Sequence, residues 1–318
     1  MATKKSVASF SEMLTKFDVN LEKPRYEIRP LVLNDLWNGV HLGYLYSLWG
    51  DAGCGKTTIA IQVIRSLLQQ GLQGVIVDVE KALNSVQLES FGLKKYVDEK
   101  RLFIVSCNNW EEFESIILST RGAGINFLLV DSVTMLQMSI ADDMSVKDVR
   151  PGLRSQQEKF VITKLKNLAF DENIACLLIS HVTANLSFSP SPYAPEKKQS
   201  GGYTLFHAVD VITKISKGPL LKNDAGDPFG VEVKIVTEKN KFSTPNRVFT
   251  EKLIYGKGID SRMSLIDRAL SLGVIEQAGA IYTLPNGEKF KGKNALYKIA
   301  DSNLVCVKEA VSNAAVKS

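Results

Sequence analysis

The eight residues GDAGCGKT, numbered 50–57, constrain the fold of this chain more than any other segment. They match the pattern G-x-x-x-x-G-K-T, follow the apolar run LYSLW and precede a helix-length amphipathic stretch. Glycines in such a turn let backbone N–H groups surround an anion, and the N-terminus of the next helix adds a favourable partial charge. The pattern therefore predicts a strand–turn–helix unit that binds nucleotide phosphates. A glycine turn with an incidental lysine is the alternative.

Within this motif the residue types have separate expected tasks. Lys56 should reach the β- and γ-phosphates, and the Thr57 hydroxyl should coordinate Mg²⁺. ATP or GTP and Mg²⁺ are therefore the expected ligands. A cysteine inside the motif also predicts sensitivity to thiol reagents. Further nucleotide contacts are expected from Gly50, Asp51, Ala52, Gly53, Cys54, Gly55 and Thr58.

Two carboxylates at the ends of other apolar runs complete the expected site. Asp131 closes the run INFLLV, where it could hold the water shell of the metal. Glu80 closes VIVDVE two residues after Asp78, on the same face of a strand, where it could activate an attacking water. Each residue also has a plainer interpretation: Asp131 could simply end a strand, and Glu80 could be a solvated strand end.

The apolar pattern predicts an α/β fold. Continuous Val, Ile and Leu runs alternate with helix-length stretches from residue 44 to about residue 217, which is typical of a mainly parallel sheet covered on both faces. The expected strands are Tyr44–Leu48, Gly74–Val79, Leu102–Val105, Phe127–Val130, Cys176–Ile179 and Val209–Ile215. Among the expected helices are Thr57–Leu68, Trp110–Thr120 and Ser155–Phe170.

Beyond this core the pattern changes. Val231–Thr237 and Val248–Tyr255 are expected to add antiparallel strands to the sheet. A helix at Leu265–Leu272 and a hairpin across Ile281–Phe290 indicate a small α+β module. At the other end we expect a short helix at Phe10–Phe17 and then an extended segment, too small to fold alone. The predicted parts are an N-terminal segment for protomer contact, a core and a C-terminal subdomain, at residues 1–33, 34–259 and 260–318.

Composition limits the cellular context. No apolar stretch approaches the ~18 residues of a membrane span, and the N-terminus lacks an apolar signal core, so a cytoplasmic protein without membrane contact is expected. The four scattered cysteines are expected to be reduced. A net charge of +5 and a pI of about 8.8 permit a polyanionic partner without requiring one.

Taken in order, these motifs resemble those of the RecA family of DNA strand-exchange recombinases. The resemblance rests on the phosphate-binding turn, VDVEKAL, LLVDSVTML, the segment LLISHV…GGYTLFHA…EKNKF…LIYGKGI and the C-terminal LIDRALSLGVIEQAGAIYTLPNGEKFKGKNA, and it covers about residues 30–300. His181 and LIDRALSLG are most similar to the bacteriophage UvsX-like branch, whereas AGAIYTLPNGEKF is more similar to bacterial RecA. The implied fold is a RecA-type P-loop ATPase core.

The resemblance also implies an activity. Such a protein is a DNA-dependent ATPase that polymerises on single-stranded DNA and pairs it with homologous duplex DNA, in a bacterial or phage-infected cell. It forms a helical homo-polymer with ATP at the protomer interface and works with a single-strand-binding or loader protein. Glu80 becomes the water-activating base, and Lys239 and Lys241 of EKNKF reach the ATP of the adjacent protomer. Where the family stacks a tyrosine on adenine, this chain has Gln87.

Two segments correspond to the DNA-binding loops of the family. The second loop, about residues 182–200, follows His181, which would sense the γ-phosphate and so couple DNA binding to nucleotide state. This long polar loop predicts phosphate contacts from lysines and base stacking from aromatic rings, unless it is a merely flexible surface loop. Its candidates are Phe188, Tyr193, Lys197, Lys198, Gly201 and Gly202, and those of the first loop, residues 139–155, are Arg150 and Arg154.

Two other functions fit the same motifs. A ring-forming motor of the same fold, either a helicase or a branch-migration ATPase, would use the same nucleotide site. A regulatory recombinase paralogue would bind DNA or a recombinase without rapid turnover. Lys56, Glu80 and Asp131 are all present, which favours an active ATPase.

Overall fold

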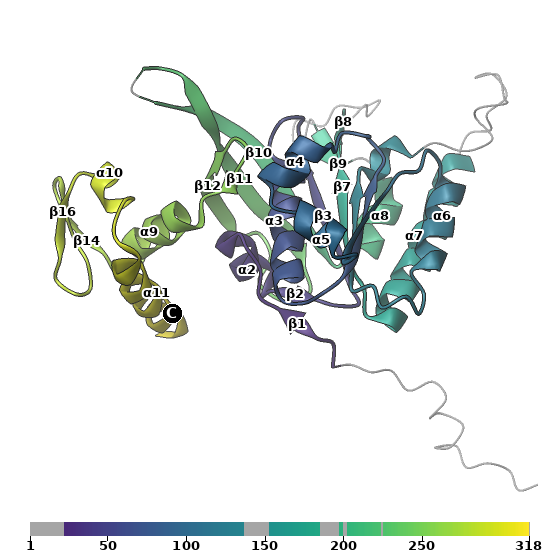
Figure 1. Cartoon of the computed structure of the whole chain (residues 1–318), viewed down its shortest axis with the longest axis horizontal. Coiled ribbons are helices and arrows are strands. Elements are labelled where there is room, and N and C mark those ends of the chain that lie inside the picture. The colour runs from purple at the N-terminus through teal and green to yellow at the C-terminus, as the bar shows by residue number, and fades with distance from the viewer. Residues whose placement is uncertain (1–21, 137–152, 185–196, 200–201, 224, 318) are drawn as a thin grey trace, which may run out of the picture.

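The computed structural model describes residues 22–136, 153–184, 197–199, 202–223 and 225–317 (Figure 1). Within them the largest sheet has nine strands in the order β13-β12-β11-β10-β3-β7-β6-β4-β5. Neighbouring strands from β10 to β5 run parallel, whereas β10 to β13 are joined antiparallel. The strands are β3 (Leu45–Gly50), β4 (Gly74–Asp78), β5 (Leu102–Val105), β6 (Phe127–Asp131), β7 (Ala175–Ser180), β10 (Val211–Lys222), β11 (Pro228–Asn240), β12 (Val248–Ile254) and β13 (Gly258–Ile259).

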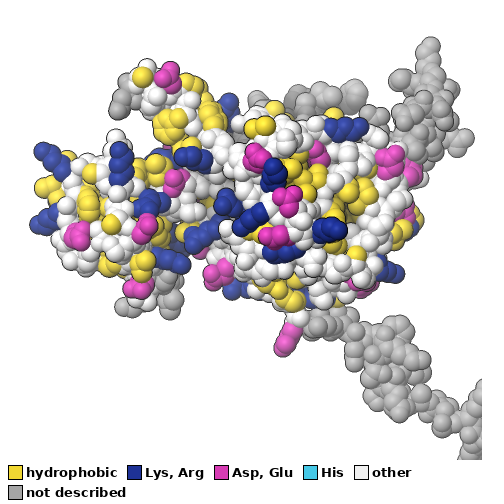
Figure 2. Space-filling view, in the orientation of Figure 1, with side chains coloured by type: hydrophobic (Ala, Val, Ile, Leu, Met, Phe, Trp, Pro, Cys, Tyr) yellow, Lys and Arg dark blue, Asp and Glu magenta, His cyan; other side chains and the backbone are white. Residues whose placement is uncertain are grey.

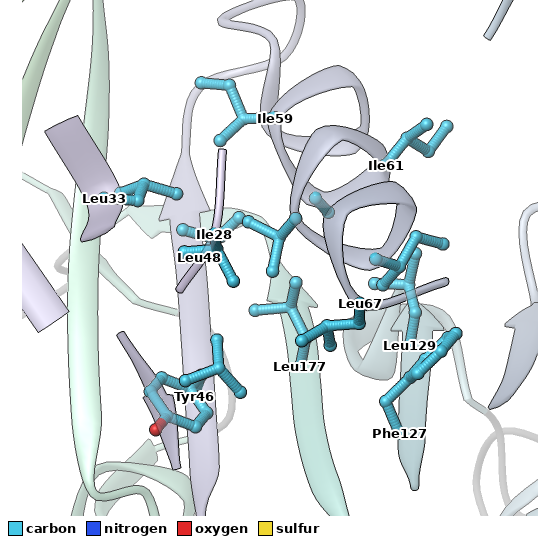
Figure 3. Close-up of a cluster of buried hydrophobic side chains, with 14 of the residues drawn as sticks. Ile28, Leu33, Tyr46, Leu48, Ile59, Ile61, Leu67, Phe127, Leu129 and Leu177 are labelled. Atoms are coloured by element: carbon cyan, nitrogen blue, oxygen red, sulfur yellow. The ribbon is translucent and has the colours of Figure 1, made fainter. Parts of the chain in front are cut away.

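Helices cover both faces of the parallel part, because its central strands are apolar on both sides. On one face α3 lies over β3, β7 and β6, and Leu67 near its C-terminal end lies beside Leu177 of β7 (Figure 3). The other face carries a second apolar cluster that includes Trp110, Phe113 and Leu165. Helices of the first face are α2 (Leu31–Trp37), α3 (Lys56–Gln69), α4 (Ser85–Ser90) and α5 (Lys94–Asp98), and those of the second are α6 (Trp110–Ser119), α7 (Leu153–Glu172) and α8 (Gly202–Ala208).

The β10–β11 hairpin is longer than the sequence pattern predicts. Its strands pair from Val211 and Asn240 to Lys222 and Pro228, with register shifts along the way. The hairpin projects beyond the sheet as a twisted ribbon (Figure 1), and hydrophobic side chains lie on its surface (Figure 2). Among them, Leu220 and Phe229 are exposed because the projecting part has no layer to pack against. The alternation of apolar and polar residues is therefore weak in the projecting part, and the sequence pattern does not indicate where β10 ends and β11 begins.

The segment after His181 has regular structure at both ends, contrary to the unstructured loop that we expected. Strands β8 (Val182–Ala184) and β9 (Lys197–Gln199) pair antiparallel as a separate two-stranded sheet. Three residues on each side are too few for a period-two pattern to be recognised. The residues between the two strands lie outside the described part of the chain.

The C-terminal module has its own apolar cluster, which includes Ile266, Leu284, Leu296 and Val307. Helix α9 begins earlier than predicted because the Asp260 carboxylate accepts hydrogen bonds from two backbone N–H groups of the first turn. The predicted hairpin is confirmed, and a third strand extends it. The module comprises α9 (Ser261–Ser271), β14 (Glu276–Ala278), β15 (Ile281–Thr283), β16 (Lys289–Lys291), α10 (Lys293–Leu296) and α11 (Asp301–Lys317).

Polar side chains contribute to the joint between this module and the core. Glu251 of β12 accepts a hydrogen bond from Ser264 of α9 at 2.9 Å, and Arg268 of α9 pairs with Asp35 of α2. Burial raises the pKa of Glu251 to about 7, and the nearby Asp267 carboxylate adds to the rise. A carboxyl group that is 9% exposed is therefore held in its neutral form at the joint up to near neutral pH.

Near the N-terminus, β1 (Arg25–Tyr26) pairs with β2 (Val40–His41), and this agrees in part with the extended segment expected at residues 26–28. The helix expected at residues 10–17 lies outside the described residues. All four cysteines are free, as expected. In the described residues no helix is long and apolar enough to cross a membrane.

Candidate nucleotide-binding and active site

The turn between β3 and α3 can be built only with glycine at two positions. Gly50 has φ +157°, and a Cβ there would lie 2.0 Å from the carbonyl oxygen of Ile215 on β10. Gly55 has φ +88° and precedes α3, and its Cβ would lie 2.2 Å from Leu253. Both positions need a conformation or a clearance that L-residues with side chains do not have. The turn therefore has the tight backbone that a phosphate-binding motif requires.

Lys56 is buried inside the turn. Its Nζ donates to the carbonyl oxygens of Gly50 at 3.0 Å and Asp51 at 2.9 Å. An ammonium group held by two loop carbonyls lies where a phosphate in the turn would meet it. Ala52 and Gly53 form the exposed tip of the turn, and Thr58 is half-buried in the first turn of α3.

Cys54 does not have the environment of a reactive thiol, contrary to the expected reagent sensitivity. Its side chain is fully buried in the first apolar cluster. Burial raises the pKa of the thiol above its ordinary value, although the charge of Lys56 opposes the rise. The thiolate is the reactive form, so this cysteine should react slowly.

Thr57 and Asp131 lie together, as a metal site in this motif requires. The Thr57 hydroxyl donates to Asp131 Oδ2 at 2.6 Å. Burial raises the pKa of Asp131 to about 6, partly offset by this hydrogen bond, and a bound cation would favour its charged form. No group of three His, Cys, Asp or Glu side chains in the described residues could enclose a metal alone. The pair fits Mg²⁺, which takes one or two protein ligands together with phosphate oxygens and water.

Glu80 lies in a bend after β4, and Asp78, two residues earlier, shapes this bend. Asp78 accepts hydrogen bonds from Ala82 N at 3.2 Å and Leu83 N at 2.9 Å, so it shapes the bend. The backbone N–H groups of Val79 and Glu80 donate to the Asp131 carbonyl oxygen. The bend is thereby tied to the strand end that carries Asp131, which brings the two candidate carboxylates to one edge of the sheet.

The Glu80 side chain contacts His181. Its Oε1 lies 2.6 Å from His181 Nε2, and each side chain is about one third exposed, at 30% and 33%. Burial raises the pKa of Glu80, but hydrogen bonds from His181 and Ser132, with the charges of His181 and Lys56, bring it below its ordinary value. Glu80 is therefore ionised at neutral pH, as a general base must be.

The Gln87 side chain is engaged in a helix cap. Asn84 Oδ1 accepts from Gln87 N at 3.0 Å, and Gln87 Oε1 accepts from Asn84 N at 3.2 Å. This reciprocal pair is a capping box at the start of α4. An adenine contact by the Gln87 side chain would compete with the cap, so its nucleotide-binding role stays a prediction.

Lys239 and Lys241 lie at the opposite end of the sheet from the phosphate-binding turn. Lys239 is paired with Ile212, which is paired with Ser47, three residues before Gly50. At about 3.3 Å per residue, the turn is ~10 Å further along the strands. The Lys239 ammonium donates to the Phe206 and His207 carbonyls at 2.8 and 3.3 Å, and that of Lys241 pairs with Asp210 at 2.6 Å.

The predicted DNA-contacting residues are described only in part. Arg154 lies in the first turn of α7, Lys197 and Lys198 lie in β9, and Gly202 is the first residue of α8. β9 pairs with β8, which directly follows His181, so the two lysines are on a segment that starts at the Glu80 contact. Arg150, Phe188, Tyr193 and Gly201 lie outside the described residues.

Three further residues of these sites were not singled out from the sequence. Ser132 contacts Glu80, Asp78 shapes the bend, and Asp210 holds Lys241. For Asp78 and Asp210 the available signal was a carboxylate inside an apolar strand, since buried carboxylates need partners. Ser132 offered only its place next to Asp131 at a strand end.

Comparisons with known proteins agree with this geometry. A family model described as the RecA N-terminal domain matches residues 36–260. Protein RecA of Heliobacterium modesticaldum is 25% identical over 256 residues, across 80% of this chain and 72% of that protein. Protein RecA of Deinococcus radiodurans is 27% identical over 259 residues, across 80% and 69%. The crystal structure of the RadB recombinase superposes with a TM-score of 0.52 at 21% identity, across 71% of this chain and 94% of that chain. The predicted α/β fold is confirmed.

Proposed function

The chain belongs to the RecA family, and we propose that it is an ATP-dependent recombinase. In this proposal it forms helical filaments on single-stranded DNA and catalyses homologous pairing and strand exchange. Its relatives named Protein RecA, at about one quarter identity, support a recombinase of this kind. The residues that bind the nucleotide and activate the attacking water would lie at the edge of the sheet where β3, β4 and β6 end.

The observation that carries the proposal is the contact of 2.6 Å between Glu80 and His181. An ionised Glu80 would accept a proton from the attacking water, while Lys56 would hold the phosphates. Thr57 and Asp131 would hold Mg²⁺, which neutralises phosphate charge when bound. His181 is directly followed by β8, so a change at Glu80 on nucleotide binding would reach the β8–β9 segment. Through this connection, hydrolysis at the nucleotide site would change the affinity of the β8–β9 segment for DNA.

The position of Lys239 and Lys241 supports a filament. These lysines lie at the end of the sheet opposite to the chain's own phosphate-binding turn, so they could serve only the nucleotide of another protomer. A protomer that offers a nucleotide at one end of its sheet and lysines at the other makes head-to-tail contacts. Such heterologous contacts generate an open helix when the rotation does not close. The nucleotide would then lie at the protomer interface, where lysines could act as arginine fingers do elsewhere.

The finer parts of the proposal rest on the sequence motifs. We propose the bacteriophage UvsX-like branch on His181 and LIDRALSLG, and a cytoplasmic, DNA-associated location in a bacterial or phage-infected cell. A single-strand-binding or loader protein would assist. Residues 1–33 would contact the adjacent protomer, residues 34–259 would form the ATPase core and residues 260–318 a C-terminal subdomain. Arg150, Arg154 and the candidates of the second loop would contact DNA.

Hydrolysis of ATP with and without single-stranded DNA, at two salt concentrations, tests the proposal. We expect strong stimulation by single strands that weakens with salt, because phosphate contacts release counterions. Glu80→Gln is the control, since it keeps hydrogen-bonding capacity but removes the base. Hydrolysis indifferent to DNA would favour a ring motor or a regulatory paralogue over a recombinase. If stimulation is seen, strand exchange between a labelled single strand and a homologous duplex tests the reaction itself.

A further inference from the structure

Two lysines, Lys241 and Lys166, pair with one buried carboxylate at the end of the sheet that carries Lys239 and Lys241. Asp210 is 1% exposed, and its Oδ1 lies 2.6 Å from Lys241 Nζ and 3.5 Å from Lys166 Nζ. Its Oδ2 accepts the backbone N–H of Leu45 at 3.0 Å. The carboxylate is therefore fixed to the first residue of β3 and directs its other oxygen toward the lysines. Lys166 belongs to α7, far from the EKNKF motif in sequence.

The same lysines hold the end of α8. Lys239 donates to the carbonyl oxygens of Phe206 and His207, and Lys166 donates to that of Ala208 at 2.5 Å. Carbonyls at a helix C-terminus attract cations, and here they keep two flexible side chains in place. The three ammonium groups are thus gathered by one carboxylate and three carbonyls on the C-terminal side of α8.

The cluster carries more positive than negative charge. The three ammonium groups outnumber the single Asp210 carboxylate, which pairs with those of Lys166 and Lys241, and the backbone carbonyls contribute only partial charge. Burial lowers the pKa of Lys239, and the charge of Lys241 lowers it further. Lys241 is half exposed, so the excess charge is accessible from outside the chain. An incoming polyanion such as a triphosphate would balance it.

We propose that Asp210 is a positioning residue for the lysines that act on a neighbouring protomer's nucleotide, and that Lys166 is a third cation of that group. The proposal rests on the trans role proposed for Lys239 and Lys241. A lysine side chain loses rotamer freedom when it is fixed on a phosphate. Because Asp210 already restricts Lys241 before assembly, part of that cost is met within the protomer. The carboxylate also reduces repulsion among the three cations.

The test is complementation between two variants with opposite defects. Asp210→Asn keeps an acceptor for Leu45 N but removes the charge that holds Lys241. Glu80→Gln loses the base but keeps Lys166, Lys239, Lys241 and Asp210, which together are called the lysine end of the protomer. We expect Asp210→Asn alone to lower DNA-stimulated ATP hydrolysis about tenfold or more. In an equimolar mixture with Glu80→Gln, about one interface in four joins an intact nucleotide site to an intact lysine end. Hydrolysis should then recover to about one quarter of the wild-type rate.

Other outcomes separate this inference from the function on which it rests. Asp210→Asn with a wild-type or higher rate, or a mixture no faster than the mean of its parents, overturns the positioning role. The double variant Lys239→Ala, Lys241→Ala mixed with Glu80→Gln tests the trans role itself. Recovery there without recovery for Asp210→Asn sinks this inference alone, whereas no recovery in either mixture sinks the trans role.

A control addresses the loss of a carboxylate that pairs with two lysines in general. Asp267 also pairs with two lysines, Lys252 and Lys293, but in the C-terminal module. Asp267→Asn should hydrolyse ATP at the wild-type rate. A fall equal to that of Asp210→Asn would show that either substitution acts through the fold, and the positioning role would be abandoned.

Discussion

Deprotonation of Glu251 should destabilise the protein as the pH rises toward 8. The side chain is buried between β12 and α9, and burial raises its pKa to about 7 from an ordinary value of 4.5. The groups that face it are the Ser264 hydroxyl, the Asp267 carboxylate, which opposes its ionisation, and the Lys252 ammonium, which favours it. Because the folded state binds the proton more tightly than the unfolded state, its contribution is complete below pH 4.5 and is lost through pH 7.

The magnitude follows from the pKa difference. A shift from 4.5 to about 7 corresponds to ~3 kcal/mol of stability that is present at acid pH and absent well above pH 7. Between about pH 6 and pH 8 the expected loss is ~1.3 kcal/mol. Glu251→Gln keeps a hydrogen-bonding group of the same shape but cannot ionise. The variant should therefore lack this part of the pH dependence.

Urea unfolding at about pH 6 and pH 8, followed by circular dichroism, measures the effect. The free energy of unfolding should fall ~1.3 kcal/mol more for the wild type than for Glu251→Gln. Glu89→Gln is the control, because Glu89 is an exposed carboxylate paired with Lys94 and should leave the wild-type dependence unchanged. Identical pH dependence in the wild type and Glu251→Gln would refute the reasoning, since Glu251 would then not titrate between these pH values.

Three further substitutions address the nucleotide site. Lys56→Ala should weaken ATP binding about a hundredfold, because two or more charge-assisted hydrogen bonds are lost, and calorimetric titration would measure it. His181→Ala should make the affinity for labelled single-stranded DNA equal with ATP and ADP in fluorescence anisotropy; a retained difference would place the sensor elsewhere. Gly50→Ala should destabilise the fold by about 2 kcal/mol in urea, because its Cβ would lie 2.0 Å from the Ile215 carbonyl.

The central sheet could be predicted because its strands are buried on both faces. A run such as Phe127–Val130 has no polar residue to interrupt it, and the observed β6 extends it by one residue to Asp131. The β8–β9 pair and the outer half of the β10–β11 hairpin could not be predicted in the same way. Their strands are too short or too exposed to carry an apolar pattern, and their pairing depends on where the chain enters and leaves the sheet.

The geometry of the candidate nucleotide site could be predicted to the extent that its residues are adjacent in sequence. The turn needs a fixed spacing from Gly50 to Thr57, so the motif alone indicates it. The contact of Glu80 with His181 spans 101 residues, and its 2.6 Å distance depends on β4, β6 and β7 being neighbours in the sheet. Asp210 was missed for the same reason, because Lys166 and Lys241 approach it from α7 and from the end of β11.

The parallel order of β10 and β3 fits the proposal that one chain holds only half of an active site. Because the two strands run in the same direction, the turn after Gly50 lies at the end of the sheet where β3 ends, and β10 begins at the other end. The antiparallel return of β11 brings Lys239 and Lys241 back to the other end. A lysine side chain cannot reach from one end of the sheet to the other by changing its rotamer. Lys239 and Lys241 could therefore act on a nucleotide only in a second protomer. Hydrolysis that depends on these lysines should therefore rise more steeply than linearly with protein concentration until filaments form.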